Sequence, residues 1–186
     1  FADKWDWDGL SRNESLPWSE SLIKRYKNNW NWGRDGAIQW QDDGRNSYLD
    51  IRYERPRHNF RDKSSTYSVH RSGLSGNESL PWSEALIKCY KNKWDWTHLS
   101  GNKSLPWTEE LIERYKDKWN WSPLKNDFFC LPLNSLSENK SLPWSEALIE
   151  RYEDKWNWKC LSSNKSLTCS EELLERYKDK WDWGAL

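Results

Sequence analysis

The pattern of hydrophobic and polar positions predicts a short amphipathic helix that recurs along the chain. In the copy that begins at Leu99, the apolar side chains fall on one face at helical spacing, and charged residues occupy the other face. The apolar positions are Leu111, Ile112, Tyr115 and Trp119. Thr108 precedes this stripe as an N-cap, and Glu109 and Glu110 follow where carboxylates favour the positive end of the helix dipole. We therefore expect a helix of about three turns that begins after Thr108.

The residues around this helix predict how the chain enters and leaves it. Pro106 holds the preceding residue extended, and Trp107 is placed to pack on Ile112 as a hydrophobic staple. After the helix, Trp119-Asn120-Trp121 alternates with a period of two, which is typical of an extended segment. Asn102 lies in a polar turn, where its side chain can bind nearby backbone. Each copy is therefore expected to contain one helix and one extended or turn segment.

The same pattern returns with a period of 25 residues wherever two copies abut. Sixteen of the seventeen Trp fall on three positions of this repeat, so the tryptophans belong to the repeat and not to one site. A single short helix is unstable in water, but stacked copies would cover each other's apolar faces. We therefore predict a mainly α tandem-repeat solenoid of 25-residue units. The copies begin at Leu10, Leu74, Leu99, Leu136 and Leu161.

Part of each unit resembles the leucine-rich repeat family. The core of that family has apolar residues three and eight positions before an Asn, and here Leu99 and Trp94 stand at those distances from Asn102. Trp96 and Leu105 fall one place away from the family pattern. The resemblance implies an alternative fold, an α/β horseshoe with one strand in each unit.

Two segments interrupt the repeat and divide the chain. Ala37 to Trp40 and Tyr48 to Tyr53 alternate like strands around Asp42-Asp43-Gly44, which predicts a β-hairpin in the first insert. The beginning of the chain falls in mid-pattern, which favours a piece of a longer array, and Leu167-Thr168-Cys169 makes the last repeat a degenerate cap. The predicted regions are 1–32 with a partial and one full repeat, insert 33–73, two repeats in 74–121, insert 122–135, and two repeats in 136–186.

The inserts differ from the repeats in composition, which makes them candidates for binding. Seven of the twelve Arg of the chain lie in the first insert. Insertions in repeat arrays project as loops on one face, which often binds a partner, although a surface loop without a role is the alternative. The residues expected to face a partner are Trp40, Tyr53, Arg55, Arg57 and His58 in the first insert, and Phe128 and Phe129 in the second.

Catalytic and metal-binding patterns are missing from the sequence. The three His have neither close mutual spacing nor a nucleophile or carboxylate arrangement typical of catalytic sites, so we expect no enzyme and no cofactor. The four Cys lack CxxC spacing, so we expect no metal, and reduced thiols would suit the cytoplasm. A disulfide between Cys160 and Cys169 is the alternative. The Cys residues are Cys89, Cys130, Cys160 and Cys169.

Every copy also carries an Asn-x-Ser triplet. In a secreted protein, these triplets would be acceptors for N-linked glycans, so secretion stays open as an alternative localisation. The alternative role is structural, because an Asn at one fixed point of each unit can form a hydrogen-bonded ladder. The asparagines are Asn13, Asn77, Asn102, Asn139 and Asn164.

Charge and periodicity together indicate a binding scaffold. The chain has 29 basic and 29 acidic residues, so no global field attracts nucleic acid or an anionic membrane. We expect a non-enzymatic scaffold for protein–protein interaction that binds through one face of the array or through the inserts. One alternative is a structural subunit that associates head to tail into a filament. The other is a carbohydrate-binding module for a polysaccharide, with aromatic platforms at Trp7, Trp32, Trp96, Trp121, Trp158 and Trp183.

Overall fold

The computed structural model describes residues 4–33, 38–42, 47–51, 72–122 and 134–186. These residues are mainly helical, as predicted, and include eight short α-helices. The helices are α1 (Trp7–Ser11), α2 (Glu20–Arg25), α3 (Glu84–Cys89), α4 (Trp96–Gly101), α5 (Glu109–Arg114), α6 (Glu146–Arg151), α7 (Trp158–Ser162) and α8 (Glu171–Arg176). The 3-10 helices η2 (Gly73–Gly76) and η3 (Leu136–Glu138) and the strands β1 (Ile38–Asp42) and β2 (Ser47–Ile51) complete the described elements.

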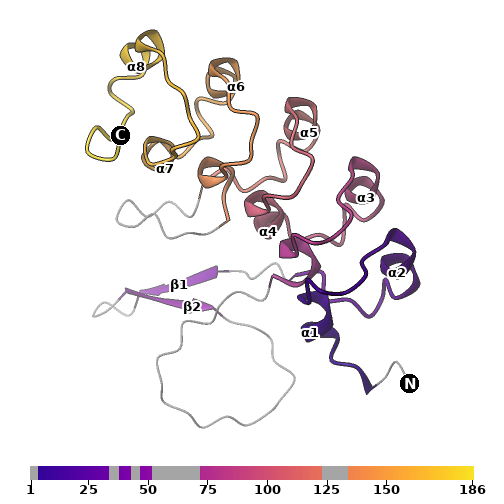
Figure 1. The fold of residues 1–186 in the computed structure, drawn as a ribbon. Coiled ribbons are helices and arrows are strands. Elements are labelled where there is room, and N and C mark those ends of the chain that lie inside the picture. The colour runs from indigo at the N-terminus through magenta and orange to yellow at the C-terminus, as the bar shows by residue number, and fades with distance from the viewer. Residues whose placement is uncertain (1–3, 34–37, 43–46, 52–71, 123–133) are drawn as a thin grey trace.

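The helices form two rows that follow one arc (Figure 1). The outer row consists of α2, α3, α5, α6 and α8, and the inner row contains α1, α4 and α7. The 3-10 helices η2 and η3 each precede an outer helix, at the point of the repeat that α4 and α7 occupy in other units. Each unit therefore contributes one outer helix and one inner element.

The outer helices begin where the sequence predicts, but they are shorter than expected. The Thr108 hydroxyl accepts a hydrogen bond from Leu111 N at 3.1 Å, which confirms it as the N-cap of α5. The helix then ends at Arg114 after six residues. The indole of Trp119 donates to Ile112 O at 3.1 Å, so this side chain satisfies a carbonyl that a longer helix would have used.

Three Trp-x-Trp segments differ from the predicted extended segment because they open a helix, whereas Trp119-Asn120-Trp121 opens no described helix. Their middle residue is a second N-cap: the Asp95 carboxylate accepts hydrogen bonds from Thr97 N and His98 N, and Trp96 opens α4. Asp6 and Asn157 begin α1 and α7 in the same way. Within the described part of the repeats there is no strand, so the alternative of a horseshoe with one strand per unit is not what forms.

The hairpin predicted in the first insert is present. Strands β1 and β2 pair antiparallel, with Ile38 opposite Ile51 and Trp40 opposite Leu49. This is the one sheet among the described residues. The helical prediction for the repeats and the hairpin prediction for the insert therefore both hold at the level of the backbone.

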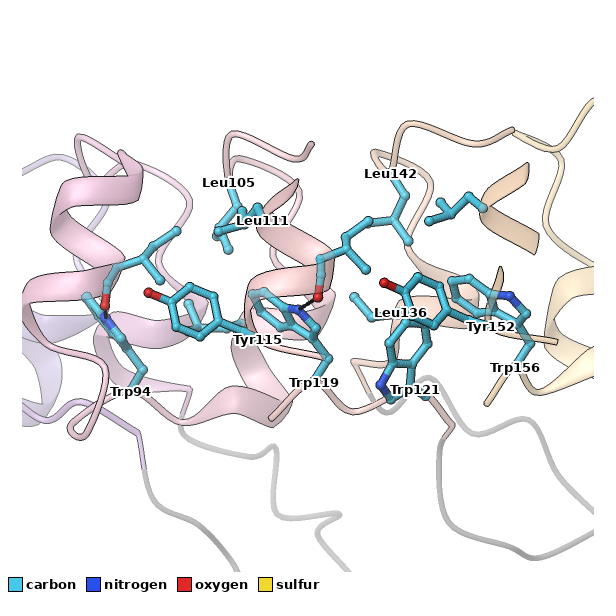
Figure 2. Close-up of a cluster of buried hydrophobic side chains, with 14 of the residues drawn as sticks. Trp94, Leu105, Leu111, Tyr115, Trp119, Trp121, Leu136, Leu142, Tyr152 and Trp156 are labelled. Atoms are coloured by element: carbon cyan, nitrogen blue, oxygen red, sulfur yellow. Dashed lines mark hydrogen bonds between the residues drawn. The ribbon is translucent and has the colours of Figure 1, made fainter. Parts of the chain in front are cut away.

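The core is one hydrophobic cluster of aliphatic and aromatic side chains to which every unit contributes. In the middle unit, Leu99, Leu111 and Ile112 are fully buried. The indole of Trp119 meets three neighbouring rings, with centroid distances of 4.8 Å to Trp96, 5.0 Å to Trp107 and 6.1 Å to Tyr115. Figure 2 shows Trp94, Trp119 and Trp156 in the same position of successive units.

Candidate functional site

Both inserts leave the inner row at the same point of the repeat, and the helical hydrogen bonds close across them. In the uninterrupted helix α4, Leu99 N donates to Asp95 O at 3.0 Å. The same bond joins Leu74 N to Asn31 O at 2.8 Å across the first insert. Leu136 N and Asn120 O form it at 2.8 Å across the second. The inserts therefore interrupt the sequence without interrupting the first turn of the inner element. We call these two places the insert bases: the first joins residues 31–33 to 73–74, and the second joins residues 120–122 to 134–136.

The first insert base is closed by two glycines in the left-handed region. Gly33 has φ +102° and Gly73 has φ +52°. A Cβ on Gly73 would lie 2.4 Å from Asn31 O and 2.5 Å from Gly33 N, so the two ends of the insert touch backbone to backbone. Only glycine fits this contact without moving the chain.

The second insert base uses an asparagine and a neighbouring glycine. Asn134 has φ +42°, a conformation that Asn tolerates better than most residues, and its carbonyl accepts a bond from Asn120 Nδ2 at 3.4 Å. A Cβ on Gly101, at the end of α4, would lie 2.6 Å from Asn134 Oδ1. The returning chain therefore lies directly against α4.

A buried hydrogen-bonded pair of His98 and Asp95 lies beside the first insert base. His98 Nδ1 and Asp95 Oδ2 are 2.7 Å apart, and both side chains are buried. A Cβ on Gly33 would meet the Asp95 side chain at 2.6 Å, so this pair packs directly against the base. The sequence prediction missed the role of His98, although the Asp-x-x-His spacing across the first turn of a helix was a readable signal.

The repeat asparagines form the predicted ladder. Asn102 Nδ2 donates to Ser75 O at 3.1 Å and to Asn77 O at 3.5 Å in the preceding unit, while its Oδ1 accepts from Ser104 N at 2.9 Å. Asn139 repeats these bonds to Ser100 O and Asn102 O. One side chain thus fixes its own turn and holds the neighbouring unit.

The repeat serines tie each inner element to the end of its own outer helix. Ser100 Oγ donates to Trp96 O at 2.6 Å and accepts from Asn120 N at 2.8 Å. Ser75 Oγ keeps this arrangement at the first insert, where it donates to Trp32 O and accepts from Asp95 N at 2.9 Å. The serine bridge therefore survives the insertion as well.

Ion pairs link the outer helices of adjacent units. Arg114 bonds to Glu84 of the preceding helix, and Arg151 lies 3.2 Å from Glu109. Cys89 stands where these units have Arg, and it is exposed. Arg176 bonds to Glu150 at the last junction, so an ion pair joins the outer helices at these three junctions, and Cys89 replaces the arginine at the first.

A tyrosine of the outer row also reaches the preceding unit. The Tyr152 hydroxyl donates to Glu113, and burial together with this bond raises the pKa of Tyr152 to about 12. Hydrogen bonds from Lys116 and Tyr152 lower the pKa of Glu113 below its usual value. The neutral phenol and the charged carboxylate therefore stabilise each other at neutral pH.

The residues predicted to face a partner lie mostly outside the described residues. Trp40 is placed in β1 by its backbone. The other six fall in residues 52–71 and 123–133, which the structure does not describe. They are Tyr53, Arg55, Arg57, His58, Phe128 and Phe129.

The predicted aromatic platforms are largely covered by their neighbours. Trp32 and Trp121 are buried, and Trp7, Trp96 and Trp158 are half-buried. The Trp121 ring lies 4.8 Å from Trp156, the Lys155 ammonium lies 5.3 Å from its centroid, and its indole donates to Lys116 O. Trp183 is 59% exposed.

The other candidate residues form no disulfide and no metal-binding group in the described part of the chain. Cys89, Cys160 and Cys169 are free thiols, so the alternative disulfide between the last two is not formed. No group of three or more His, Cys, Asp or Glu within the described ranges could hold a metal ion. None of the described helices is both long and apolar enough to cross a membrane. Protein-family models, curated proteins and solved structures were compared with the chain, and none matches it.

Proposed function

We propose that the chain is a tandem-repeat solenoid that acts as a non-enzymatic scaffold and presents its two inserts to a protein partner. The observation that carries this proposal is the closure of the helical hydrogen bonds across both insert bases, at 2.8 Å in each case. A scaffold needs this property, because a binding segment can then vary without loss of the supporting core. Each unit adds contacts to the next one, so the stacked units hold both bases in fixed positions.

The position of the bases supports binding from one side. Both belong to the inner row of elements, where Figure 1 places η2 and η3 between the inner helices. Two inserts that leave the same row can contact one partner together, and a rigid array lowers the ordering cost of that contact. A protein is the favoured partner because the chain has no net charge to attract nucleic acid.

The repeat itself supplies the variant that tests this proposal. In α4 the residues between Trp96 and Leu99 are Thr97 and His98. Replacing residues 33–73 by Thr-His would restore the 25-residue period at the first base, and the same replacement of 122–135 would restore it at the second. We expect both variants, and their combination, to keep the helical circular dichroism and the cooperative melting of the parent chain.

Binding is then measured with the immobilised parent chain and the three variants. Proteins from the source cells that are retained by the parent, and lost when either insert is replaced, would support a joint binding surface. Retention of the same proteins by the doubly replaced chain would contradict the proposal, because the inserts would then be dispensable. Failure of the replaced chains to fold would also contradict it, since the bases would not be independent of the inserts.

A further inference from the structure

The five repeat asparagines share one sequence triplet but have two different environments. Asn13, in the first unit, is exposed, whereas the other four are between 2% and 6% exposed. The serine of every triplet is exposed. The triplet Asn-x-Ser is the acceptor motif for N-linked glycans, so the fold separates five equal motifs into one open site and four closed ones. The closed asparagines are Asn77, Asn102, Asn139 and Asn164.

The atom that would carry a glycan is the atom that holds the units together. Asn77 Nδ2 donates to Ser11 O at 3.0 Å and to Asn13 O at 3.5 Å. Asn139 Nδ2 donates to Ser100 O at 2.9 Å and to Asn102 O at 3.4 Å. A primary amide has two N–H groups, and in these units both are directed at carbonyls of the preceding unit. A sugar would replace one of them and would also need room inside the interface.

We propose that N-glycosylation of the four closed asparagines and stacking of the units exclude each other, and we use the exposed Asn13 as the reference site. The co-reactant is a glycosyl diphosphate. The amide nitrogen forms a bond to the anomeric carbon, the bond from that carbon to the diphosphate oxygen breaks, and the diphosphate leaves with the bonding electrons. The nitrogen loses one proton and keeps the other, so no oxidant or reductant is needed.

Asn13 shares the hydrogen bond at the side-chain Oδ1 with the other repeat asparagines, but it lacks their Nδ2 bonds to a preceding unit. Its Oδ1 accepts from Ser15 N at 2.8 Å, as Asn102 Oδ1 accepts from Ser104 N. Its turn is therefore already formed, and the exposed side chain leaves the amide accessible to an enzyme. Glycosylation at this position would occur without opening an interface between units.

The first experiment uses purified protein with a soluble N-glycosyltransferase and UDP-glucose as the probe. Asn120-Trp121-Ser122 also matches the triplet but is not a repeat asparagine, so a Ser122→Ala background removes it. Peptide mass mapping should find glucose on Asn13 in the native protein and on all five asparagines in urea. Because the closed sites need local opening, we expect their modification to be at least about tenfold slower in the native state. Equal rates at Asn13 and Asn102 in the native state would overturn the proposal.

The second experiment uses secretion from a eukaryotic cell, where chains meet the transferase before they fold. The control variant carries Ser→Ala at Ser79, Ser104, Ser141 and Ser166, which removes the closed acceptors and leaves every asparagine in place. We expect this variant to be secreted with native circular dichroism and a glycan on Asn13, and the parent to be retained with glycans on the closed sites. Secreted parent protein that is folded and also glycosylated at a closed site would overturn the proposal.

Discussion

The middle unit that begins at Leu99 and the last unit that begins at Leu161 have the same pattern but different cores. The middle unit and Trp96, which precedes it, have four rings in contact, and each of the three indoles among them donates to a backbone carbonyl. In the last unit Cys169 replaces one ring, and among the described residues the indole N–H of Trp181 has no hydrogen-bond partner. Trp121, at the end of the middle unit, is 9% exposed, whereas Trp183, at the equivalent position of the last unit, is 59% exposed.

The difference shows that burial is set by the neighbouring unit rather than by the residue type. Ile112 is fully buried, but Leu174 at the same position of the last unit is only partly buried. At the other end, Leu22 is partly buried, while Leu111 at the same position is fully buried. The position of Ile112 and Leu174 therefore faces the following unit. The position of Leu22 and Leu111 faces the preceding unit. An identical side chain stabilises the chain by an amount that depends on whether its neighbour is present.

The comparison predicts the largest effect at the buried Trp of the middle unit. Trp119→Ala removes three ring contacts and the hydrogen bond to Ile112 O, so we expect a loss of about 3–5 kcal/mol in the free energy of unfolding. Trp183→Ala is the control, because its exposed ring should contribute less than about 1 kcal/mol. Urea titration followed by circular dichroism measures both. Equal losses would contradict the claim that the neighbouring unit sets the contribution.

A second comparison concerns the asparagine ladder. Asn102→Ala removes the bond to Ser75 O inside an interface and the longer bond to Asn77 O, which keeps its bond from Trp82 Nε1, so a loss of about 1–3 kcal/mol is expected. Asn13→Ala removes only the bond from Ser15 N at the exposed first unit, and it should cost less than about 1 kcal/mol. The same titration compares them. A larger effect at Asn13 would mean that the turn, and not the contact between units, is the main role of this residue.

The features that could be predicted from the sequence are those set within one unit. Thr108 is followed by two carboxylates and an apolar stripe, and this local signal was enough to place the start of α5. The ladder of Asn102 followed from its fixed place in every copy. The hairpin followed from alternation on either side of Asp42-Asp43-Gly44. In each case the deciding contacts lie close together in sequence or recur with the period.

The features that could not be predicted depend on contacts between distant residues. Alternating indoles on either side of one polar residue predict an extended segment, but in the segment around Asp95 the carboxylate caps α4. The first insert base is closed by the hydrogen bond from Leu74 N to Asn31 O. No local sequence pattern predicts a hydrogen bond that spans the 41 residues from Gly33 to Gly73. The glycines at both ends were a usable signal, since their close contact requires the missing Cβ.

A pH dependence is expected at the contact between Tyr152 and Glu113. Because the folded pKa of Tyr152 is raised to about 12, the stability it contributes is fully present below the ordinary value of 10.0 and is lost as the pH rises towards 12. Between pH 8 and pH 11 the parent should therefore lose about 1 kcal/mol that Tyr152→Phe does not lose. Urea midpoints at the two pH values measure this difference. A constant gap between parent and variant would show that the phenol is not held neutral by burial and by Glu113.

The smallest effect is expected from rebuilding the last unit to resemble the middle one. Trp107 donates to Asn102 O at 2.9 Å, but in the last unit the equivalent carbonyl, Asn164 O, accepts from Leu167 N at 3.0 Å instead. Cys169→Trp alone should therefore gain little, because the local backbone already uses that acceptor. Thr168→Pro together with Cys169→Trp would favour the backbone of the other units and allow the indole to bind, for a gain of about 1 kcal/mol. An equal gain in the free energy of unfolding from the single and the double variant would contradict this explanation. The last unit would then lack only the buried ring area, and its backbone conformation would not limit stability.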